Sequence, residues 1–177
     1  MCETGPPAAV VVMAKEPIAG RTKTRLGEAL SGEAAAGLYA AMLADRLEQV
    51  ASLEDVVPAV AVAGHDGLGP TPKLIPPGFQ VAPQPPGDLG VGLAAAAAHY
   101  LAQGLPVVLV DSDSPSLPNA YLRRAVALVR GADPRPCDLV IGACEDGGYY
   151  LLGLTAPHPE LFEDMPWSTS EVVPRTL

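Results

Sequence analysis

A cationic segment directly follows the first apolar run of the chain and is the stretch best suited to bind an anion. Residues 15–26 contain four basic side chains and a single acid, in a protein whose formal net charge is −9. The basic side chains are Lys15, Arg21, Lys23 and Arg25. Arginine binds phosphate through paired hydrogen bonds, and lysine supplies a compact positive charge. Together with the backbone amides around Gly20, these side chains predict a di- or triphosphate site, although a solvated charged loop is the alternative.

Carboxylates follow two later apolar runs. Asp111 and Asp113 come directly after residues 106–110, and Asp146 lies in a turn after residues 138–143. Carboxylate oxygens suit Mg²⁺ or Mn²⁺, which usually bridge one or two carboxylates to substrate phosphates. Asp111 and Asp113 are therefore candidate metal ligands, and Asp146 either completes the metal site or acts as a base toward an acceptor hydroxyl. The structural alternatives are an Asx-turn or helix cap for the first two and a hairpin turn for the third.

A third polar segment, residues 84–90, precedes an alanine-rich helical pattern. Its candidate nucleotide contacts are Gln84, Gly87 and Asp88, because helix N–H groups and close backbone approach at glycine suit a ribose or a nucleobase. The alternative, which these residues alone favour, is a proline-rich loop in which Asp88 caps the helix.

Apolar runs alternate with helical patterns along the whole chain. The predicted strands are residues 8–14, 56–63, 79–82, 106–110, 138–143 and 149–154. The predicted helices are residues 32–51, a stretch ending near Gly104 and residues 121–130, with a further helix start at Ser168 or Thr169. This alternation predicts an α/β fold with a mostly parallel, twisted sheet. Ligands of such sheets bind beyond the carboxyl ends of the strands, which is where the polar segments fall.

Three details of this pattern give local expectations. In residues 32–51 the charged side chains, including Arg46, fall largely outside the apolar stripe, and Ser31 is expected to cap the helix. Pro58 within the second strand indicates an edge strand or a late strand start. Trp167 is expected to fill the core.

Length and composition limit the class of protein. The 177 residues suit a single domain spanning 1–177. An excess of acids, 20 against 11 basic residues, argues against nucleic-acid binding, and no apolar run is long enough for membrane insertion. Three unclustered cysteines favour a reducing cytoplasm over a disulfide framework. The three histidines, His65, His99 and His158, lie outside the polar segments and are interpreted as incidental.

Several motifs, taken together, carry a resemblance to a known family. They are Lys15-x-Pro17-x-x-Gly20-x-x-Lys23-Thr24-Arg25-Leu26, Gln84-x-x-Gly87-Asp88-Leu89-Gly90, Asp111-Ser112-Asp113-Ser114-Pro115-Ser116-Leu117, Glu145-Asp146-Gly147-Gly148-Tyr149-Tyr150-Leu151-Leu152-Gly153-Leu154 and Trp167-Ser168-Thr169. In this order they resemble a bacterial family of poorly characterised transferases, described as selenodomain-associated transferase-like. That family is similar to nucleotide-diphospho-sugar transferases of the GT-A type, whose fold is a three-layer α/β/α sandwich.

The resemblance implies roles for individual residues and a class of reaction. Asp113 would be the main metal ligand, and Asp146 would be the second carboxylate of the site. The phosphate contacts would be Arg21, Lys23 and Arg25, which neutralise charge on the leaving nucleoside diphosphate. The implied enzyme is a metal-dependent glycosyltransferase that uses Mg²⁺ or Mn²⁺, a sugar nucleotide and a small-molecule acceptor, with Asp146 and Lys23 as its catalytic residues.

Two other functions stay open. Residues 23–26, Lys-Thr-Arg-Leu, also resemble the Lys-Ser-Arg-Leu of phospholactate guanylyltransferases, so nucleotidyl transfer from an NTP to a phosphorylated small molecule, with pyrophosphate release, is an alternative. A non-catalytic nucleotide-binding module is another. It is motivated by Gly92, where the family usually has an arginine, and by an expected continuation of the family past Leu177. We therefore expect a chain that is either truncated or divergent at its C-terminus, and we leave a homo-oligomer open.

Overall fold

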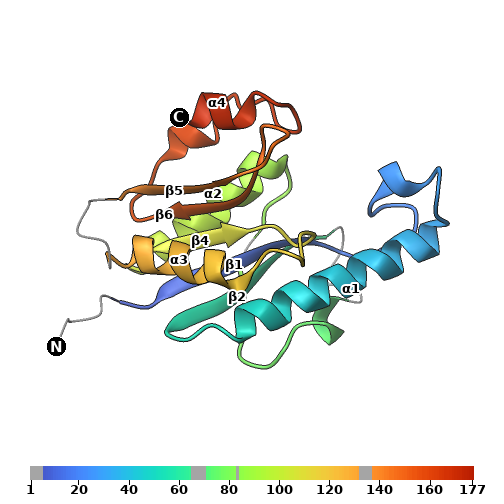
Figure 1. The fold of residues 1–177 in the computed structure, drawn as a ribbon, viewed down its shortest axis with the longest axis horizontal. Helices are drawn as coiled ribbons and strands as arrows, with labels where there is room; N and C mark the ends of the chain where they lie inside the picture. The colour runs from blue at the N-terminus through green and yellow to red at the C-terminus, as the bar shows by residue number, and fades with distance from the viewer. Residues whose placement is uncertain (1–5, 65–70, 83, 132–136) are drawn as a thin grey trace.

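The computed structural model describes residues 6–64, 71–82, 84–131 and 137–177, which form one six-stranded sheet with helices on both faces (Figure 1). The strand order is β3-β2-β1-β4-β6-β5. The strands are β1 (Ala8–Lys15), β2 (Val56–Ala63), β3 (Gln80–Ala82), β4 (Val107–Val110), β5 (Leu139–Ala143) and β6 (Tyr149–Leu154). β1 to β4 run parallel, whereas β6 is antiparallel to both of its neighbours. The prediction of a mostly parallel sheet is confirmed.

Helices cover both faces of the sheet and complete the three-layer α/β/α sandwich (Figure 1). They are α1 (Gly32–Ala51), α2 (Leu89–Leu101), α3 (Asn119–Val129) and the short α4 (Val172–Thr176), with 3-10 turns at Thr24–Leu26, Thr71–Lys73 and Pro159–Leu161. α1 and α3 pack on one face through Leu43 and Leu122, and α2 packs on the other through Tyr100. Within the described ranges, no helix has the length and apolar character needed to cross a membrane.

β1 lies at the centre of the sheet and shows why a continuous apolar run folds as a buried strand. Val10 and Val12 pack into the core under α1 and α3, whereas Ala9 and Val11 pack into the core under α2. Successive side chains of a strand point to opposite faces, and here both faces are covered. Every position of the run must therefore be apolar until the chain reaches the sheet edge at Lys15, which is exposed.

Two local predictions differ from the structure. Pro58 predicted an edge strand or a late strand start, but β2 is internal, between β3 and β1, and it already begins at Val56. Its pairing with β3 covers only Ala59–Ala61, so the proline, which lacks an N–H, stands outside that ladder. The helix predicted to start at residues 168–169 begins instead at Val172. Ser168 has a left-handed backbone with φ 65°, whereas an N-cap has an extended backbone, so the helix starts later.

Candidate functional site

The predicted site segments meet at the edge of the sheet where β1 and β4 end. The two strands are parallel neighbours, with Val12 paired to Val110, so the cationic segment after β1 lies beside Asp111 after β4. β6 starts at the same edge because it runs antiparallel to β4, and the Asp111 N–H donates to the Tyr150 carbonyl at 3.0 Å. The structure therefore brings the first two polar segments and the start of β6 together.

Two adjoining hollows open at this edge and share a cationic wall. The first hollow, of about 700 Å³, is lined by Gln84 and Gly87. The second hollow, of about 520 Å³, is lined by Asp111, by Asp113 and by the start of β6. Both are lined by Lys15, Arg21 and Thr22. A ligand that spans the two hollows would therefore place its middle against two cations.

The cationic segment is held in shape by its own backbone. Thr22 is buried, and its hydroxyl donates to the Glu16 carbonyl and accepts from the Ile18 N–H at 3.3 Å. Gly20 has a left-handed backbone with φ 74°, which glycine adopts without steric cost. Lys23 is also left-handed, with φ 54°, a conformation that costs energy for a residue with a side chain. Because such strain clusters at functional sites, the backbone marks Lys23 as a candidate functional residue of this segment.

Lys23 contacts Asp113 across the second hollow and joins a network of polar groups. Its ammonium forms an ion pair with the Asp113 carboxylate and lies 5.8 Å from the ring centroid of Tyr39. The Tyr39 hydroxyl accepts from the Lys15 N–H at 2.9 Å and shares a hydrogen bond of 2.8 Å with the Ser112 hydroxyl. Partial burial lowers the pKa of Lys23. Asp113 is thus neutralised by a cation that comes from the predicted phosphate-binding segment.

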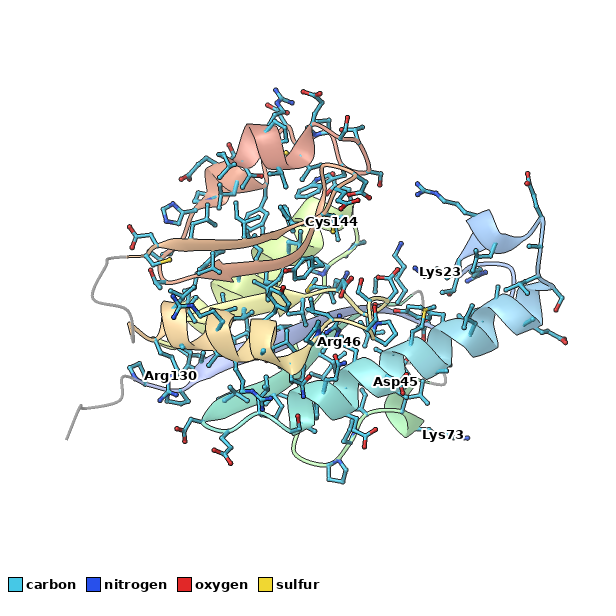
Figure 2. All side chains as sticks on the ribbon, viewed as in Figure 1. Lys23, Asp45, Arg46, Lys73, Arg130 and Cys144 are labelled. Atoms are coloured by element: carbon cyan, nitrogen blue, oxygen red, sulfur yellow. The ribbon has the colours of Figure 1, made fainter. Side chains whose placement is uncertain are left out.

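Arg46 of α1 is a fully buried cation, and the prediction that it lies off the buried face is wrong. Its Nη2 donates to Asp111 Oδ1 at 2.8 Å and to the Ser114 carbonyl at 2.6 Å. Its Nη1 donates to Gln49 Oε1 at 2.8 Å. In Figure 2, Arg46 points toward the sheet, whereas the neighbouring Asp45 points away from it. The burial of Arg46 is tolerated because its charge is paired with Asp111 and both Nη atoms are hydrogen-bonded, although Nε has no partner among the described residues.

Both carboxylate oxygens of Asp111 are engaged inside the protein. Oδ1 accepts from Arg46, and Oδ2 accepts from the Ser114 hydroxyl. These contacts fix the loop that carries Asp113, whose side chain remains 36% exposed. The two aspartates therefore have different surroundings, because Asp111 anchors the loop and Asp113 faces the second hollow. Metal ligation by either one stays a prediction.

The burial of Arg46 was not predicted, although the sequence held a signal for it. Arg46 follows Tyr39 by seven residues and Leu43 by three, and both of those side chains are buried. Residues at these spacings share one face of a helix. The spacing alone therefore places Arg46 on the buried face, and its charge was the reason for placing it elsewhere.

A divalent cation fits this site through Asp113. Across the described ranges, no three His, Cys, Asp or Glu side chains stand close enough together to hold a metal ion. Mg²⁺ commonly takes only one or two protein carboxylates and completes its shell with water and substrate phosphates. A partly exposed carboxylate beside a cationic wall suits that pattern, whereas Asp111 is already bonded to Arg46. The predicted Mg²⁺ or Mn²⁺ site thus has Asp113 as its best-placed ligand.

Asp146 lines a third hollow, of about 350 Å³, that adjoins the second. The residues common to the second and third hollows are Arg25, Leu89, Tyr149 and Ser168. Asp146 Oδ1 accepts from the Gly148 N–H at 3.0 Å, as in the Asx-turn that an Asp-Gly hairpin favours. Of the two roles predicted for Asp146, contact with an acceptor is the one that this position favours, and both stay predictions.

Some residues of the polar segment 84–90 line the first hollow, and others stabilise the local backbone. Gln84 and Gly87 line the hollow, whereas Asp88 caps α2 by accepting a hydrogen bond of 3.0 Å from an N–H of the first turn. A Cβ on Gly92 would lie 2.8 Å from Gln84 Nε2. The glycine that departs from the family pattern therefore makes room for the Gln84 side chain.

The cysteine and histidine side chains of the described ranges show no activated nucleophile at this edge. Cys144 is exposed as a residue, but partial desolvation of its thiol, together with the Asp146 charge, raises the pKa of that thiol. His99 and His158 line none of the three hollows. His65 lies outside the described residues.

Comparison with family models assigns the chain to a bacterial family. The model described as "Uncharacterized protein conserved in bacteria (DUF2064)" matches residues 43–169. The chain belongs to this family. No protein with a curated function matches this DUF2064 protein.

Solved structures share the fold of this DUF2064 protein. One, from Desulfovibrio desulfuricans G20 and described as a "putative nucleotide-diphospho-sugar transferase", matches with a TM-score of 0.85 and 28% sequence identity over 97% of this chain and 74% of that chain. Another, 4-diphosphocytidyl-2C-methyl-D-erythritol synthase, matches with a TM-score of 0.52 and 12% identity over 96% of this chain and 84% of that chain. The second likeness concerns the fold alone. The family resemblance and the fold class predicted from the sequence are confirmed, and the first match supports a transferase.

Proposed function

We propose that this DUF2064 protein transfers a glycosyl group from a sugar nucleotide to a small-molecule acceptor. The observation that carries the proposal is the cationic wall shared by the first two hollows. Lys15 and Arg21 line both hollows, while Asp113 lines only the second. A diphosphate bound against this wall leaves its nucleoside in the first hollow and its sugar in the second.

The first hollow supports the nucleoside end of this arrangement. Gln84 Oε1 is buried and has no hydrogen-bond partner within the described residues. Rotation of the Gln84 amide toward the hollow would let this oxygen accept from an N–H group of a nucleobase, and an unmet hydrogen bond otherwise costs roughly 1–3 kcal/mol. Gly87 exposes backbone at the same hollow, where a side chain would limit close approach.

The transfer requires the protein to stabilise a leaving nucleoside diphosphate. An acceptor hydroxyl attacks the anomeric carbon, and its new C–O bond forms while the bond from that carbon to the diphosphate breaks. The diphosphate oxygen keeps the electron pair, and Arg21 and Lys23 neutralise the charge that develops on it. The proton of the acceptor hydroxyl passes to a carboxylate, for which Asp146 is the candidate.

Asp113 would hold Mg²⁺ or Mn²⁺ beside the donor phosphates. When bound, the ion would supply charge neutralisation for the phosphate oxygens. Lys23 now pairs with Asp113, so donor binding requires Lys23 to exchange or share its partner. A phosphate oxygen carries the same sign of charge as the carboxylate, which makes it a suitable new partner for the Lys23 ammonium.

Nucleotidyl transfer is a second candidate, favoured by the number of cations at the site. The second hollow is lined by Lys15, Arg21, Lys23 and Arg25. Four cations suit the larger charge of a nucleoside triphosphate at least as well as that of a diphosphate. In that reaction an acceptor oxygen attacks the α-phosphorus, and pyrophosphate leaves with the electron pair of the broken P–O bond.

Calorimetry with nucleoside diphosphates and triphosphates, with and without Mn²⁺, tests the donor site. We expect Mn²⁺-dependent binding that Asp113→Asn weakens by about tenfold or more, since hydrogen bonds and ligation to a charged group contribute about 1.5–3 kcal/mol. The matched control is Asp45→Asn, which removes an exposed carboxylate of α1 that points away from the sheet (Figure 2). Unchanged binding in Asp113→Asn would sink the assignment of the metal ligand.

Product analysis separates the candidate reactions. Release of a nucleoside diphosphate from a sugar nucleotide supports glycosyl transfer. Release of pyrophosphate from a nucleoside triphosphate supports nucleotidyl transfer instead. Tight nucleotide binding without either product supports a non-catalytic nucleotide-binding module.

A further inference from the structure

We infer that the third hollow is the acceptor site and that it binds a small anion carrying at least one hydroxyl group. The inference rests on the proposed transfer reaction and adds the chemical class of its acceptor. Three of the side chains that line the hollow differ in their chemistry and would contact different parts of the acceptor. They are the carboxylate of Asp146, the guanidinium of Arg25 and the indole of Trp167.

The three hollows form a row in which the second adjoins both of the others. The first and second share Lys15, Arg21 and Thr22, and the second and third share Arg25, Leu89, Tyr149 and Ser168. The first and third have no lining residue in common. With the nucleoside in the first hollow and the transferred group in the second, the third is where an acceptor can meet that group.

Arg25 gives the third hollow its preference for an anion. The residue is exposed, and its guanidinium makes no hydrogen bond or ion pair with another described residue. A free guanidinium presents paired donors that match two oxygens of a phosphate or a carboxylate. Because Arg25 lines both the second and the third hollow, an anion bound there holds the acceptor next to the reacting group.

Asp146 and Trp167 would contact the hydroxyl group and the C–H groups of the acceptor, respectively. Asp146 is exposed at the hollow and supplies a carboxylate that can accept the hydroxyl proton. Trp167 packs against Gly90, where a Cβ would lie 2.7 Å from the indole Nε1, and meets Tyr149 edge-on with ring centroids 6.3 Å apart. The indole is therefore fixed in place and offers an apolar surface to the C–H groups of a small hydroxylated molecule.

Tryptophan fluorescence of the whole chain tests this inference, because Trp167 is its one tryptophan. The protein is titrated separately with sn-glycerol 3-phosphate and with D-glycerate, which distinguish a phosphate from a carboxylate as the bound anion. Glycerol and inorganic phosphate each lack one of the two required features. We expect a saturable change in emission with at least one hydroxylated anion, at a concentration about tenfold or more below that needed for either control.

Matched arginine variants then assign the response to a hollow. Arg25→Gln is expected to weaken binding of the hydroxylated anion by about tenfold or more, since it removes a charge-assisted contact. Arg21→Gln, which alters the first two hollows only, should weaken nucleotide binding in calorimetry instead. Arg123→Gln, which removes an exposed arginine of α3, should leave both titrations unchanged.

The outcomes separate this inference from the proposed function. No response to either hydroxylated anion, or an undiminished response in Arg25→Gln, overturns the acceptor site while nucleotide binding leaves the donor site standing. Equal affinity for inorganic phosphate overturns the hydroxyl requirement, and equal affinity for glycerol overturns the anion requirement. If the anions bind but no nucleotide does, the proposed transfer fails, and the acceptor assignment fails with it.

Discussion

Asp111 and Asp113 are two residues apart on one loop, yet the protein surrounds them differently. The two carboxylate oxygens of Asp111 accept hydrogen bonds from the buried Arg46 and from Ser114, whereas Asp113 forms an ion pair with Lys23 at the second hollow. The first carboxylate is bound by the scaffold, and the second is bound by a side chain of the candidate ligand site. Residue type is the same in both cases, so the partner and its burial decide which aspartate supports the fold and which one is available to a ligand.

The largest expected effect comes from removing the buried partner of Asp111. Arg46→Met should lower the free energy of unfolding by about 3 kcal/mol, because it leaves a half-buried carboxylate without its cation. Urea unfolding measures the change. The matched control is Arg123→Met on α3, an exposed site where we expect a change within about 0.5 kcal/mol.

A double variant sharpens this prediction. Arg46→Met combined with Asp111→Leu removes both charges, so it should recover part of the stability that Arg46→Met loses. If Arg46→Met is as stable as Arg123→Met, then Arg46 does not anchor the loop and the contrast between the two aspartates collapses.

Asp113→Asn should show the opposite pattern. Turnover of the nucleotide-activated donor should fall by about 100-fold or more, because the carboxylate that positions charge at the donor phosphates is lost. The free energy of unfolding should change by less than about 0.5 kcal/mol, since an ion pair that is partly exposed to solvent contributes little. Parallel activity and urea measurements check both parts, and a large loss of stability here would show that Asp113 is structural.

Lys23→Gln tests the cation that pairs with Asp113, the aspartate available to a ligand. Nucleotide affinity should fall by about tenfold, because one charge-assisted contact to phosphate is lost. Mn²⁺ added alone should bind more tightly than in the unaltered protein, since the cation that competes for Asp113 is gone. Lys73→Gln, at an exposed lysine in another part of the molecule, is the control in both titrations (Figure 2). Weaker Mn²⁺ binding in Lys23→Gln would contradict the competition.

The smallest expected effect concerns two glycines. Gly92→Ala places a methyl group 2.8 Å from Gln84 Nε2, so the Gln84 side chain must shift and nucleotide affinity should fall by a few-fold, on the order of 0.5–1 kcal/mol. Gly37→Ala in α1 meets no atom within 4 Å and should instead raise helix stability by roughly 0.5–1 kcal/mol with nucleotide affinity unchanged. Calorimetry and urea unfolding of the two variants separate these effects.

The edge of the sheet at which the candidate site lies could be predicted from the sequence, because the polar segments follow predicted strands. The strand order could not be predicted in this way. The run ending at Lys15 had to be buried on both faces, and the run ending at Val110 had to lie in the same sheet. In parallel neighbours the residues after such runs meet at one edge, whatever their side chains. The cationic segment and Asp113 could therefore be brought together on pattern alone.

Two features could not be predicted in the same way: the pairing of the buried Arg46 with Asp111, and the placement of Asp146 in a different hollow from Asp113. The charge of Arg46 suggested that this residue lies off the buried face of α1. Its helical spacing places it on that face, and its ion pair with Asp111 makes the burial of the charge tolerable. Asp146 belongs to a different hollow because it sits in the turn between β5 and β6, beyond the edge where β1 and β4 end. The helical spacing of Arg46 indicated its burial, but its pairing with Asp111 leaves no periodic trace in the sequence.

The proposed function requires a nucleoside diphosphate to bind against the cationic wall between the first two hollows. Calorimetric titration of Arg21→Gln and Arg123→Gln with nucleoside diphosphates in the presence of Mn²⁺ tests it most directly. We expect saturable binding to the unaltered protein, about tenfold weaker binding to Arg21→Gln and unchanged binding to Arg123→Gln. Equal affinity in the two variants, or no binding of any nucleoside diphosphate to the unaltered protein, would contradict it.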